Sequence, residues 1–376
     1  MNRTTPIRQT SNPPAGEDFG SDQRFLQTAR FWTPLDRKTL RCQLCPHACV
    51  LPAGAIGRCG VRLNRDGELF TLVHSRVSAA HVDPIEKKPL FHFLPGSQAL
   101  SLGTAGCNVH CRFCQNAELA HVGRELPPGE FLPPEQIVQL ARARHCPSIA
   151  FTYSEPTIFA EFLLDTVDAA QAAGLRTVAV SNGYIQPEAL RQVFGSLDAL
   201  KVDLKAFNPR FYRDVVGARL EPVLDTLVSL RSLGKWLEIV NLVIPTLNDS
   251  EAELRQMAQW IRAHLGPDVP LHFTRFHPSH QMLHLPATPV TTLELARQIA
   301  LAEGLHYVYI GNVPGHPAQN TFCPACGRPV IERVGFTATK IHLTPASTCP
   351  ACQHPIPGLW WQAPKIQIES AGDSVL

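Results

Sequence analysis

The chain has 376 residues, 44% of them hydrophobic, which is enough for one α/β barrel with smaller appended modules. Its 34 lysine and arginine residues nearly balance 32 aspartate and glutamate residues, so no nucleic acid or acidic membrane surface is expected as a partner. Residues 1–23 lack the apolar stretch of a signal peptide, and no segment approaches the roughly 18 apolar residues of a membrane span. These features predict a soluble, cytoplasmic protein.

Twelve cysteines are the most informative feature of the composition, because eleven of them fall in three tight groups. A secreted disulfide scaffold would spread its cysteines through a short chain with little core. Here the spacings are those of metal ligands inside a long chain, which favours thiolate–metal chemistry. Only Cys146 stands apart from the groups.

The first 100 residues are predicted to hold a flexible leader and a small, loop-rich module. Residues 1–25 are rich in Pro, Ser, Thr and Gly, and residues 26–100 contain a β-like run at 69–73 and the first cysteine group. Four thiols within 18 residues suit either structural zinc or an auxiliary iron–sulfur cluster, and the sequence does not choose between them. The four are Cys42, Cys45, Cys49 and Cys59.

Residues 101–318 alternate between strand-like and helix-like segments. Strands are expected at 101–106, 148–153, 176–184, 197–204, 236–245, 271–277 and 306–311, and helices at 133–145, 158–174, 187–194, 221–234, 250–266 and 292–304. Several helical segments begin with Pro or Ser and end at Gly, as helix starts and stops do. Repeated β–α units give a parallel sheet, and no G-x-G-x-x-G follows the first strand. The sequence therefore predicts an α/β fold with a partial (β/α)6-type, TIM-like barrel.

Three cysteines follow the first predicted strand as Cys107-x3-Cys111-x2-Cys114. Soft sulfur ligands select iron–sulfur chemistry, and a fully ligated 4Fe–4S cluster takes four cysteines. Three ligands leave one iron with an open coordination position, as a catalytic metal site requires. A zinc site, or an electron-transfer cluster completed by Cys146, is the alternative that the spacing leaves open.

The residues around these cysteines resemble a known family. The Cys-x3-Cys-x2-Cys spacing, with Phe113 before the last cysteine, is similar to the signature of radical S-adenosylmethionine (SAM) enzymes. The string GTAGCNVHCRFCQN, preceded by DPIEKKPLFHFLPGS at 83–97, resembles the radical SAM member of the AmmeMemoRadiSam system. That subgroup is related to the activating enzymes of pyruvate formate-lyase and other glycyl-radical enzymes. The likeness extends over about residues 40–361 and implies that the barrel is of the radical SAM type.

By this resemblance, two strand ends acquire roles in binding SAM. The run at 152–157 resembles the G-G-E-P element of the family, which implies that Glu155 accepts hydrogen bonds from the SAM ammonium group. Ser181 and Asn182 resemble the T-N-G element that borders the ribose and carboxylate of SAM. From the residues alone, Glu155 is also consistent with a helix cap, and S-N-G with a simple turn. Val180 stands where activating enzymes often carry Asp, so no cation site is expected there.

Three further residues are implied by later strand ends. Asp203 and Lys205 are two positions apart, so they share one face of a strand, which in a barrel is the lumen. Charges placed there are costly unless they meet each other or a ligand. The resemblance implies a D-x-K element that contacts SAM, and a structural ion pair is the alternative. His277 resembles a histidine that approaches the SAM adenosine, although His272 and His280 lie close by in the sequence.

Two CPAC strings predict a zinc-ribbon-like module over residues 319–362, followed by a tail at 363–376. Four thiolates around one ion would stabilise a module with too little core to fold alone. Activating enzymes of pyruvate formate-lyase are shorter and lack both outer modules, which favours the AmmeMemoRadiSam subgroup. The predicted ligands are Cys323, Cys326, Cys349 and Cys352.

The resemblance implies a radical SAM oxidoreductase with a 4Fe–4S cluster and SAM. Ligand number and spacing predict zinc in the C-terminal cysteine group, and zinc or an auxiliary iron–sulfur cluster in the N-terminal group. Reductive cleavage of SAM would give methionine and a 5′-deoxyadenosyl radical, which abstracts hydrogen from a substrate that the sequence does not identify. The implied partners are a one-electron donor such as flavodoxin or ferredoxin, and Memo-like and AMMECR-type proteins. A glycyl-radical enzyme activase and a non-catalytic, metal-stapled scaffold are the alternatives.

Overall fold

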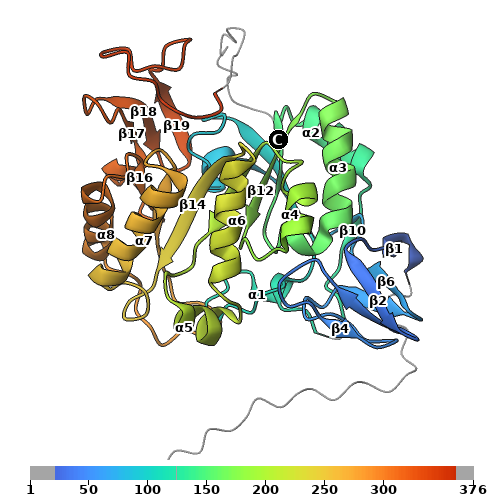
Figure 1. The fold of residues 1–376 in the computed structure, drawn as a ribbon. Helices are drawn as coiled ribbons and strands as arrows, with labels where there is room; N and C mark the ends of the chain where they lie inside the picture. Colours follow the sequence, from blue (N-terminus) through green and yellow to red (C-terminus); the bar gives the residue numbers. More distant parts are fainter. Residues whose placement is uncertain (1–21, 124, 361–376) are drawn as a thin grey trace, which may run out of the picture.

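The centre of the fold is a curved sheet of eight strands in the order β16-β15-β14-β13-β12-β11-β9-β8 (Figure 1). The computed structural model describes residues 22–123 and 125–360. Seven of the strands run parallel, and β8 lies antiparallel to β9 at one edge. Their bounds are β8 Ala79–Pro84, β9 Gln98–Gly103, β11 Ser148–Phe151, β12 Arg176–Ser181, β13 Ala199–Asp203, β14 Trp236–Val243, β15 Leu271–Arg275 and β16 Val308–Gly311.

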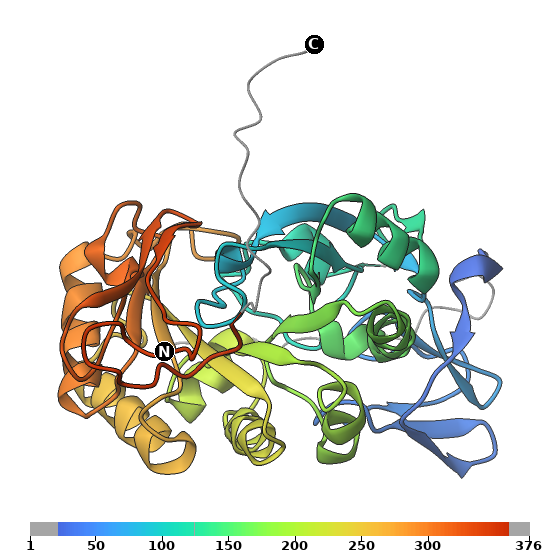
Figure 2. The same cartoon turned by 90° about the horizontal axis from the view of Figure 1, so that it is seen from above.

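Six helices connect the parallel strands and lie outside the curve of the sheet (Figure 2). Local sequence explains where they begin: α2 and α4 carry Pro134 and Pro187 in their first turn, and the Ser250 hydroxyl accepts from Glu253 N at 3.3 Å to cap α7. The predicted α/β fold with a partial (β/α)6-type barrel is confirmed. The helices are α2 Pro134–Ala143, α3 Ala160–Ala172, α4 Pro187–Val193, α6 Glu221–Ser232, α7 Glu251–Leu265 and α8 Val290–Ala302.

A segment that precedes β9 fills the concave side of the sheet. Residues 85–97 begin with η2 (Ile85–Lys87) and bring Phe93 and Leu94 against the first half of the sheet (Figure 2). The strand positions that face them are small, as at Ala99 and Ala150, so the large side chains have room. From the sequence, the boundary between the N-terminal module and the barrel was predicted at residue 100. In the structure, β8 and the segment after it belong to the barrel, so the boundary lies before β8.

The N-terminal module contains two small antiparallel sheets, one of which includes residues 69–71 of the β-like run predicted at 69–73. The first sheet has the order β1-β6-β5 and the second β2-β3-β4, while β7 pairs with β10. Of the predicted leader at 1–25, residues 1–21 lie outside the described residues; η1 (Gln23–Phe25) begins the described chain and Phe25 is buried. The strands are β1 Gln27–Thr28, β2 Trp32–Asp36, β3 Thr39–Cys42, β4 Val50–Leu51, β5 Arg62–Arg65, β6 Glu68–Thr71, β7 Arg76–Val77 and β10 Glu130–Phe131.

The C-terminal module is a three-stranded antiparallel sheet in the order β17-β18-β19, and it follows η5 (Pro317–Gln319). Its strands are β17 Thr321–Phe322, β18 Pro329–Val334 and β19 Thr337–Ile341. The tail predicted at 363–376 lies outside the described residues. Among the helices of the described chain, none combines the length and apolar character that crossing a membrane requires.

A buried ion pair joins the N-terminal module to the barrel. Glu161, in the first turn of α3, accepts from both terminal nitrogens of Arg62 at 3.1–3.2 Å and from Arg30 N at 2.7 Å. Neither charged side chain is more than 2% exposed. Removing one partner of such a pair leaves the other charge uncompensated away from water.

Glu161→Ala is therefore expected to lower the free energy of unfolding by about 3–5 kcal/mol. Urea denaturation followed by circular dichroism measures this loss. Asp168→Ala, at an exposed position of the same helix, is the matched control and should change stability by no more than about 0.5 kcal/mol. Equal effects of the two substitutions would contradict this role of the ion pair.

Candidate active site

The three cysteines expected to hold iron lie on one loop at the carboxyl edge of the sheet. β9 ends at Gly103, and Cys107, Cys111 and Cys114 follow it. Cys107 and Cys111 are buried, whereas Cys114 is partly exposed. Burial raises the pKa of all three thiols, and that of Cys111 to about 11. A thiol binds metal as the thiolate, so metal binding at this loop would release protons.

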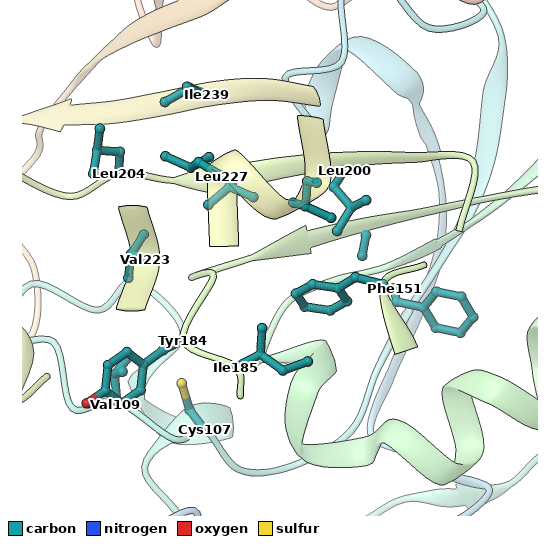
Figure 3. Packing of buried hydrophobic residues seen from close by; sticks show 14 of the residues in the cluster. Cys107, Val109, Phe151, Tyr184, Ile185, Leu200, Leu204, Val223, Leu227 and Ile239 are labelled. Atoms are coloured by element: carbon teal, nitrogen blue, oxygen red, sulfur yellow. The ribbon is translucent and has the colours of Figure 1, made fainter. Parts of the chain in front are cut away.

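Side-chain amides fix one side of this loop. Asn108 donates to the Tyr184 carbonyl at 2.7 Å and accepts from Asn182 at 2.9 Å. The same Asn182 amide nitrogen lies 3.7 Å from Cys107 Sγ. Figure 3 shows Cys107 beside Tyr184 and Ile185, at the border of the buried cluster. The chain's own contacts therefore attach the loop to the end of β12.

The segment after β13 holds the other side of the loop. It forms α5 (Pro209–Phe211) and the π-helical turn η4 (Tyr212–Val216). Carbonyl oxygens of η4 accept from the backbone nitrogens of His110 at 2.9 Å and Arg112 at 3.0 Å. These bonds fix the backbone on either side of Cys111. The loop is thus held at both sides by protein groups.

Glu155 lies at the centre of a buried hydrogen-bond network. Its Oε1 accepts from the Thr157 hydroxyl, the Thr157 backbone and the Ser181 hydroxyl at 2.7–3.0 Å, and its Oε2 accepts from Asn182 N at 2.8 Å. It is therefore the N-cap of η3 (Pro156–Phe159), as one interpretation of the sequence expected. Within residues 22–123 and 125–360, Oε2 has one hydrogen-bond donor, which leaves capacity for a ligand ammonium group. Burial raises the pKa of Glu155 despite these bonds.

Glu155→Gln is expected to weaken SAM binding and to lower stability by about 1–3 kcal/mol. The Glu155 carboxylate accepts from four donors at two oxygens, whereas a carboxamide has a single acceptor oxygen. Isothermal titration calorimetry and urea denaturation measure the two effects. Thr157→Val is the matched comparison, since it removes one donor and keeps the carboxylate. It should lower stability without weakening SAM binding. Unchanged SAM affinity in Glu155→Gln would leave Glu155 as a cap only.

Asp203 lies between two lysines at the end of β13. Its carboxylate forms ion pairs with Lys201 and with Lys205, the latter at 3.3 Å. Burial raises the pKa of Asp203, but the two ammonium groups outweigh that effect and bring the pKa below its usual value. Asp203 is the last residue of β13 and Lys205 lies two residues beyond it, and both side chains line the same cavity. Lys201 was not among the predicted residues, although it is the next residue in the same alternation.

These groups line one cavity of about 590 Å³ in front of the cysteine loop. The volume falls within the range of about 300–1,000 Å³ that is usual for small-molecule sites. Its walls come from the carboxyl ends of β11 to β15, where barrel enzymes place their chemistry. We call this cavity the chamber. It is lined by all three loop cysteines together with Glu155, Ser181, Asn182, Asp203 and Lys205.

The segment after β8 supplies two more lysines to the chamber. Lys88 Nζ lies 2.6 Å from one Asp83 oxygen, and Lys87 Nζ lies 2.7 Å from the other. The Tyr153 hydroxyl donates to the same carboxylate at 2.7 Å. These lysines belong to the DPIEKKP string. That string contributed to the family resemblance, but no role in the site was predicted for it. An adjoining cavity of about 730 Å³ shares Lys87 and Tyr153 with the chamber.

Two sequence expectations differ from the structure. His277 is exposed and does not line the chamber, because β15 ends at Arg275 and the inward position is Thr274. Cys146 precedes β11, whereas Cys107 follows the parallel β9, so the two cysteines lie at opposite edges of the sheet. Cys146 therefore cannot complete a cluster on the loop.

The N-terminal cysteines lie against the cysteine loop. Gly106, with φ +99°, would place a Cβ only 2.7 Å from the Cys59 carbonyl oxygen, so a larger residue would separate the module from the loop. His47 Nε2 lies 2.8 Å from the Asn108 carbonyl oxygen. Within the N-terminal cysteine group, Cys42 N donates to the Cys49 carbonyl at 2.9 Å. Cys45 is the fourth cysteine of that group.

Comparison with known proteins identifies the family. A sequence model described as Radical SAM superfamily matches residues 101–259. The uncharacterized protein MJ0808 of Methanocaldococcus jannaschii is 43% identical over 318 residues, which cover 85% of this chain and 95% of that protein. The chain belongs to the radical SAM superfamily. The expectation that it is an enzyme of this kind is confirmed.

More distant radical SAM proteins match parts of the chain. The pyruvate formate-lyase-activating enzyme of Clostridium pasteurianum is 24% identical over 159 residues, which cover 42% of this chain and 66% of that enzyme, slightly less than two thirds. A solved radical SAM methyltransferase from Sphaerobacter thermophilus is 15% identical, with 76% of each chain covered and a TM-score of 0.47. The sequence match to the activating enzyme supports a relation to that group at the level of the superfamily.

Membership in the radical SAM superfamily implies a 4Fe–4S cluster and SAM, and the residues of the chamber fit both groups. Three thiols on one loop face a cavity that also contains carboxylate and ammonium groups. The Ser154 hydroxyl is buried in the chamber wall and has no hydrogen-bond partner among the described residues, so it is available to a ligand. Carboxylates suit the SAM ammonium group, and lysines suit its carboxylate.

Proposed function

We propose that this chain cleaves SAM reductively and directs the resulting radical to a substrate bound in the chamber. When bound there, a reduced 4Fe–4S cluster supplies one electron that breaks a sulfonium C–S bond of SAM, giving methionine and a 5′-deoxyadenosyl radical that abstracts hydrogen. The observation that carries the proposal is the set of three loop cysteines that open on one cavity with Glu155 and Asp203.

The chain's own residues then have defined tasks. Glu155 accepts from the SAM ammonium group through Oε2, and Asn182 holds the loop beside Cys107. Asp203 and Lys205 contact the amino-acid part of SAM, and Ser181 orients Glu155. Burial of these groups excludes water from the radical. Because His277 is exposed outside the chamber, it has no task in this proposal.

Anaerobic reconstitution tests the proposal. The full chain is loaded with iron and sulfide, reduced with dithionite and supplied with SAM, and 5′-deoxyadenosine is measured by mass spectrometry. We expect a 4Fe–4S electron paramagnetic resonance signal that changes when SAM binds, and formation of 5′-deoxyadenosine. A loaded protein that neither binds nor cleaves SAM would overturn the proposal.

We further propose that the chain is the radical SAM member of the AmmeMemoRadiSam system. It would take its electron from a flavodoxin or ferredoxin and act together with Memo-like and AMMECR-type proteins. The residues that support this assignment are the long DPIEKKPLFHFLPGS and GTAGCNVHCRFCQN strings and the two outer cysteine modules. Co-purification of the full chain with these proteins tests the association, and no enrichment over an unrelated bait would contradict it.

An activase for a glycyl-radical enzyme is the second candidate. The similarity to the pyruvate formate-lyase-activating enzyme of Clostridium pasteurianum favours it. This candidate predicts that adding a glycyl-radical enzyme strongly increases 5′-deoxyadenosine formation and produces a glycyl radical signal. Cleavage that does not respond to such a partner would exclude it.

A further inference from the structure

The C-terminal module reaches the chamber from outside the barrel. Phe336 follows Gly335 at the turn between β18 and β19, and its side chain lines the chamber. Gly335 has φ +60°, which allows the tight turn that brings the ring there. Phe336 is the chamber's one contribution from this module, since the other lining residues all precede β17.

A buried arginine joins the same module to the lysine-bearing segment of the chamber. Arg333 on β18 donates to the Phe91 carbonyl at 2.7 Å, and its guanidinium carbon lies 4.2 Å from the centre of the Phe91 ring. Its Nε lies 3.6 Å from Glu86, and both charged side chains are 0% exposed. Glu86 directly precedes Lys87 and Lys88. These contacts attach the segment that bears the two lysines to the C-terminal module.

The four cysteines of the module have the spacing of ligands to a single ion. Sγ atoms of Cys323 and Cys352 are 3.5 Å apart, those of Cys326 and Cys349 are 3.7 Å apart, and all four lie within 4.8 Å of one another. With zinc–sulfur bonds of about 2.3 Å, a tetrahedral site has sulfur–sulfur edges of about 3.8 Å. The cysteines of a 4Fe–4S cluster bind different irons and so stand farther apart.

The cysteine site and the barrel share one small hydrophobic cluster. Cys323 and Cys349 are buried in it with Phe91, Tyr307 and Tyr309. Only Val330 and Ile356 complete the cluster's buried residues, so the module has little core of its own. A metal ion bound by the four thiols would hold the two CPAC loops together.

We propose that these four cysteines bind one Zn²⁺ and that the zinc-bound module forms part of the chamber wall through Phe336 and Arg333. The zinc is structural, with four closed ligands and no open position. Phe336 then limits what enters the chamber, and Arg333 positions the segment of Lys87 and Lys88. The wall function rests on the proposed function, whereas zinc binding does not.

Alkylation of individual cysteines tests zinc binding in the wild-type full chain. Cys326 and Cys352 are exposed, so as free thiols they would react quickly with N-ethylmaleimide. We expect Cys326 and Cys352 to react slowly with N-ethylmaleimide while one zinc per chain is bound at this site. After a chelator removes the metal, their reaction should be several-fold faster. Rapid alkylation both before and after chelation would overturn the assignment.

A double substitution gives an independent check by metal analysis. Cys326→Ser/Cys352→Ser is expected to lose one zinc per chain relative to the wild type, whereas Cys146→Ser, outside all three groups, should lose none. Loss of iron instead of zinc would overturn the assignment. If the double variant does not fold, the alkylation result on the wild-type chain still decides.

The wall function is tested on the iron-free chain, so that it does not depend on SAM cleavage. Phe336→Ala is expected to speed alkylation of Cys111 several-fold, because this thiol lines the chamber and not the adjoining cavity. Val334→Ala is the matched control, because Val334 lies on the same hairpin, is 67% exposed and does not line the chamber. Equal rates in the two variants would overturn the wall function. A chain that shows both effects but never cleaves SAM would contradict only the proposed function.

Discussion

Replacement of Cys107, Cys111 or Cys114 by alanine is expected to reduce 5′-deoxyadenosine formation below detection. Under the proposed function each thiolate would bind a different iron of the cluster, and the loop has three cysteines. Two thiolates would hold the cluster weakly, so iron and sulfide content should fall together with activity. Metal analysis of the reconstituted variants and mass spectrometry of the reaction products measure both losses.

Cys146→Ala is the matched control for these variants. Cys146 is also a buried cysteine of the barrel, but β11 separates it from the carboxyl edge of the sheet. It should retain iron and cleave SAM at the wild-type rate. A triple variant that lacks Cys107, Cys111 and Cys114 and still forms 5′-deoxyadenosine would show that the cluster is bound elsewhere in the chain.

The barrel could be predicted because its information is local. Each parallel strand is a short apolar run bounded by Pro, Gly or polar residues, and each helix has its own start and stop signals. The ends of the strands were less accurate. Residues 101–106 were expected as the first strand, whereas β9 is Gln98–Gly103, because its register is set by pairing with the antiparallel β8. The residues between Pro84 and β9 carry no local sequence pattern from which this pairing could be predicted.

The parts of the site that could not be predicted come from distant segments. Phe336 reaches the chamber from a module more than two hundred residues after the cysteine loop, and nothing in its own sequence indicates that contact. Residues 85–97 look like a loop because their apolar residues have no period, although they fill the concave side of the sheet. Lys201 is different, since the alternation Lys201-x-Asp203-x-Lys205 already places it on the inner face.

His277 shows how a family likeness can fail at one position. The strand before it ends two residues earlier, so the side chain is no longer bound by the alternation that points Thr274 inward. Outside a strand, sequence spacing alone does not fix direction. Asp203 and Glu155 are oriented by other means: Asp203 is the last residue of β13, and Glu155 is fixed by its hydrogen bonds as the N-cap of η3.

Asp203→Asn is expected to affect both SAM binding and folding. The substitution removes the charge between Lys201 and Lys205, whose side chains are only 7% and 13% exposed. Stability should fall by about 2–3 kcal/mol, below the full cost of breaking a buried pair because the carboxylate itself is 26% exposed. SAM affinity should fall at least about tenfold, since a hydrogen bond to a charged group contributes about 1.5–3 kcal/mol.

A second substitution separates the two effects. Lys201→Met in the Asp203→Asn background removes a cation that no longer has its partner, so urea denaturation should show that most of the lost stability returns. SAM affinity, measured by isothermal titration calorimetry, should stay low, because the carboxylate that we propose to contact SAM is still absent. If affinity returned together with stability, Asp203 would be part of a structural ion pair and Lys205 would have to contact SAM without it.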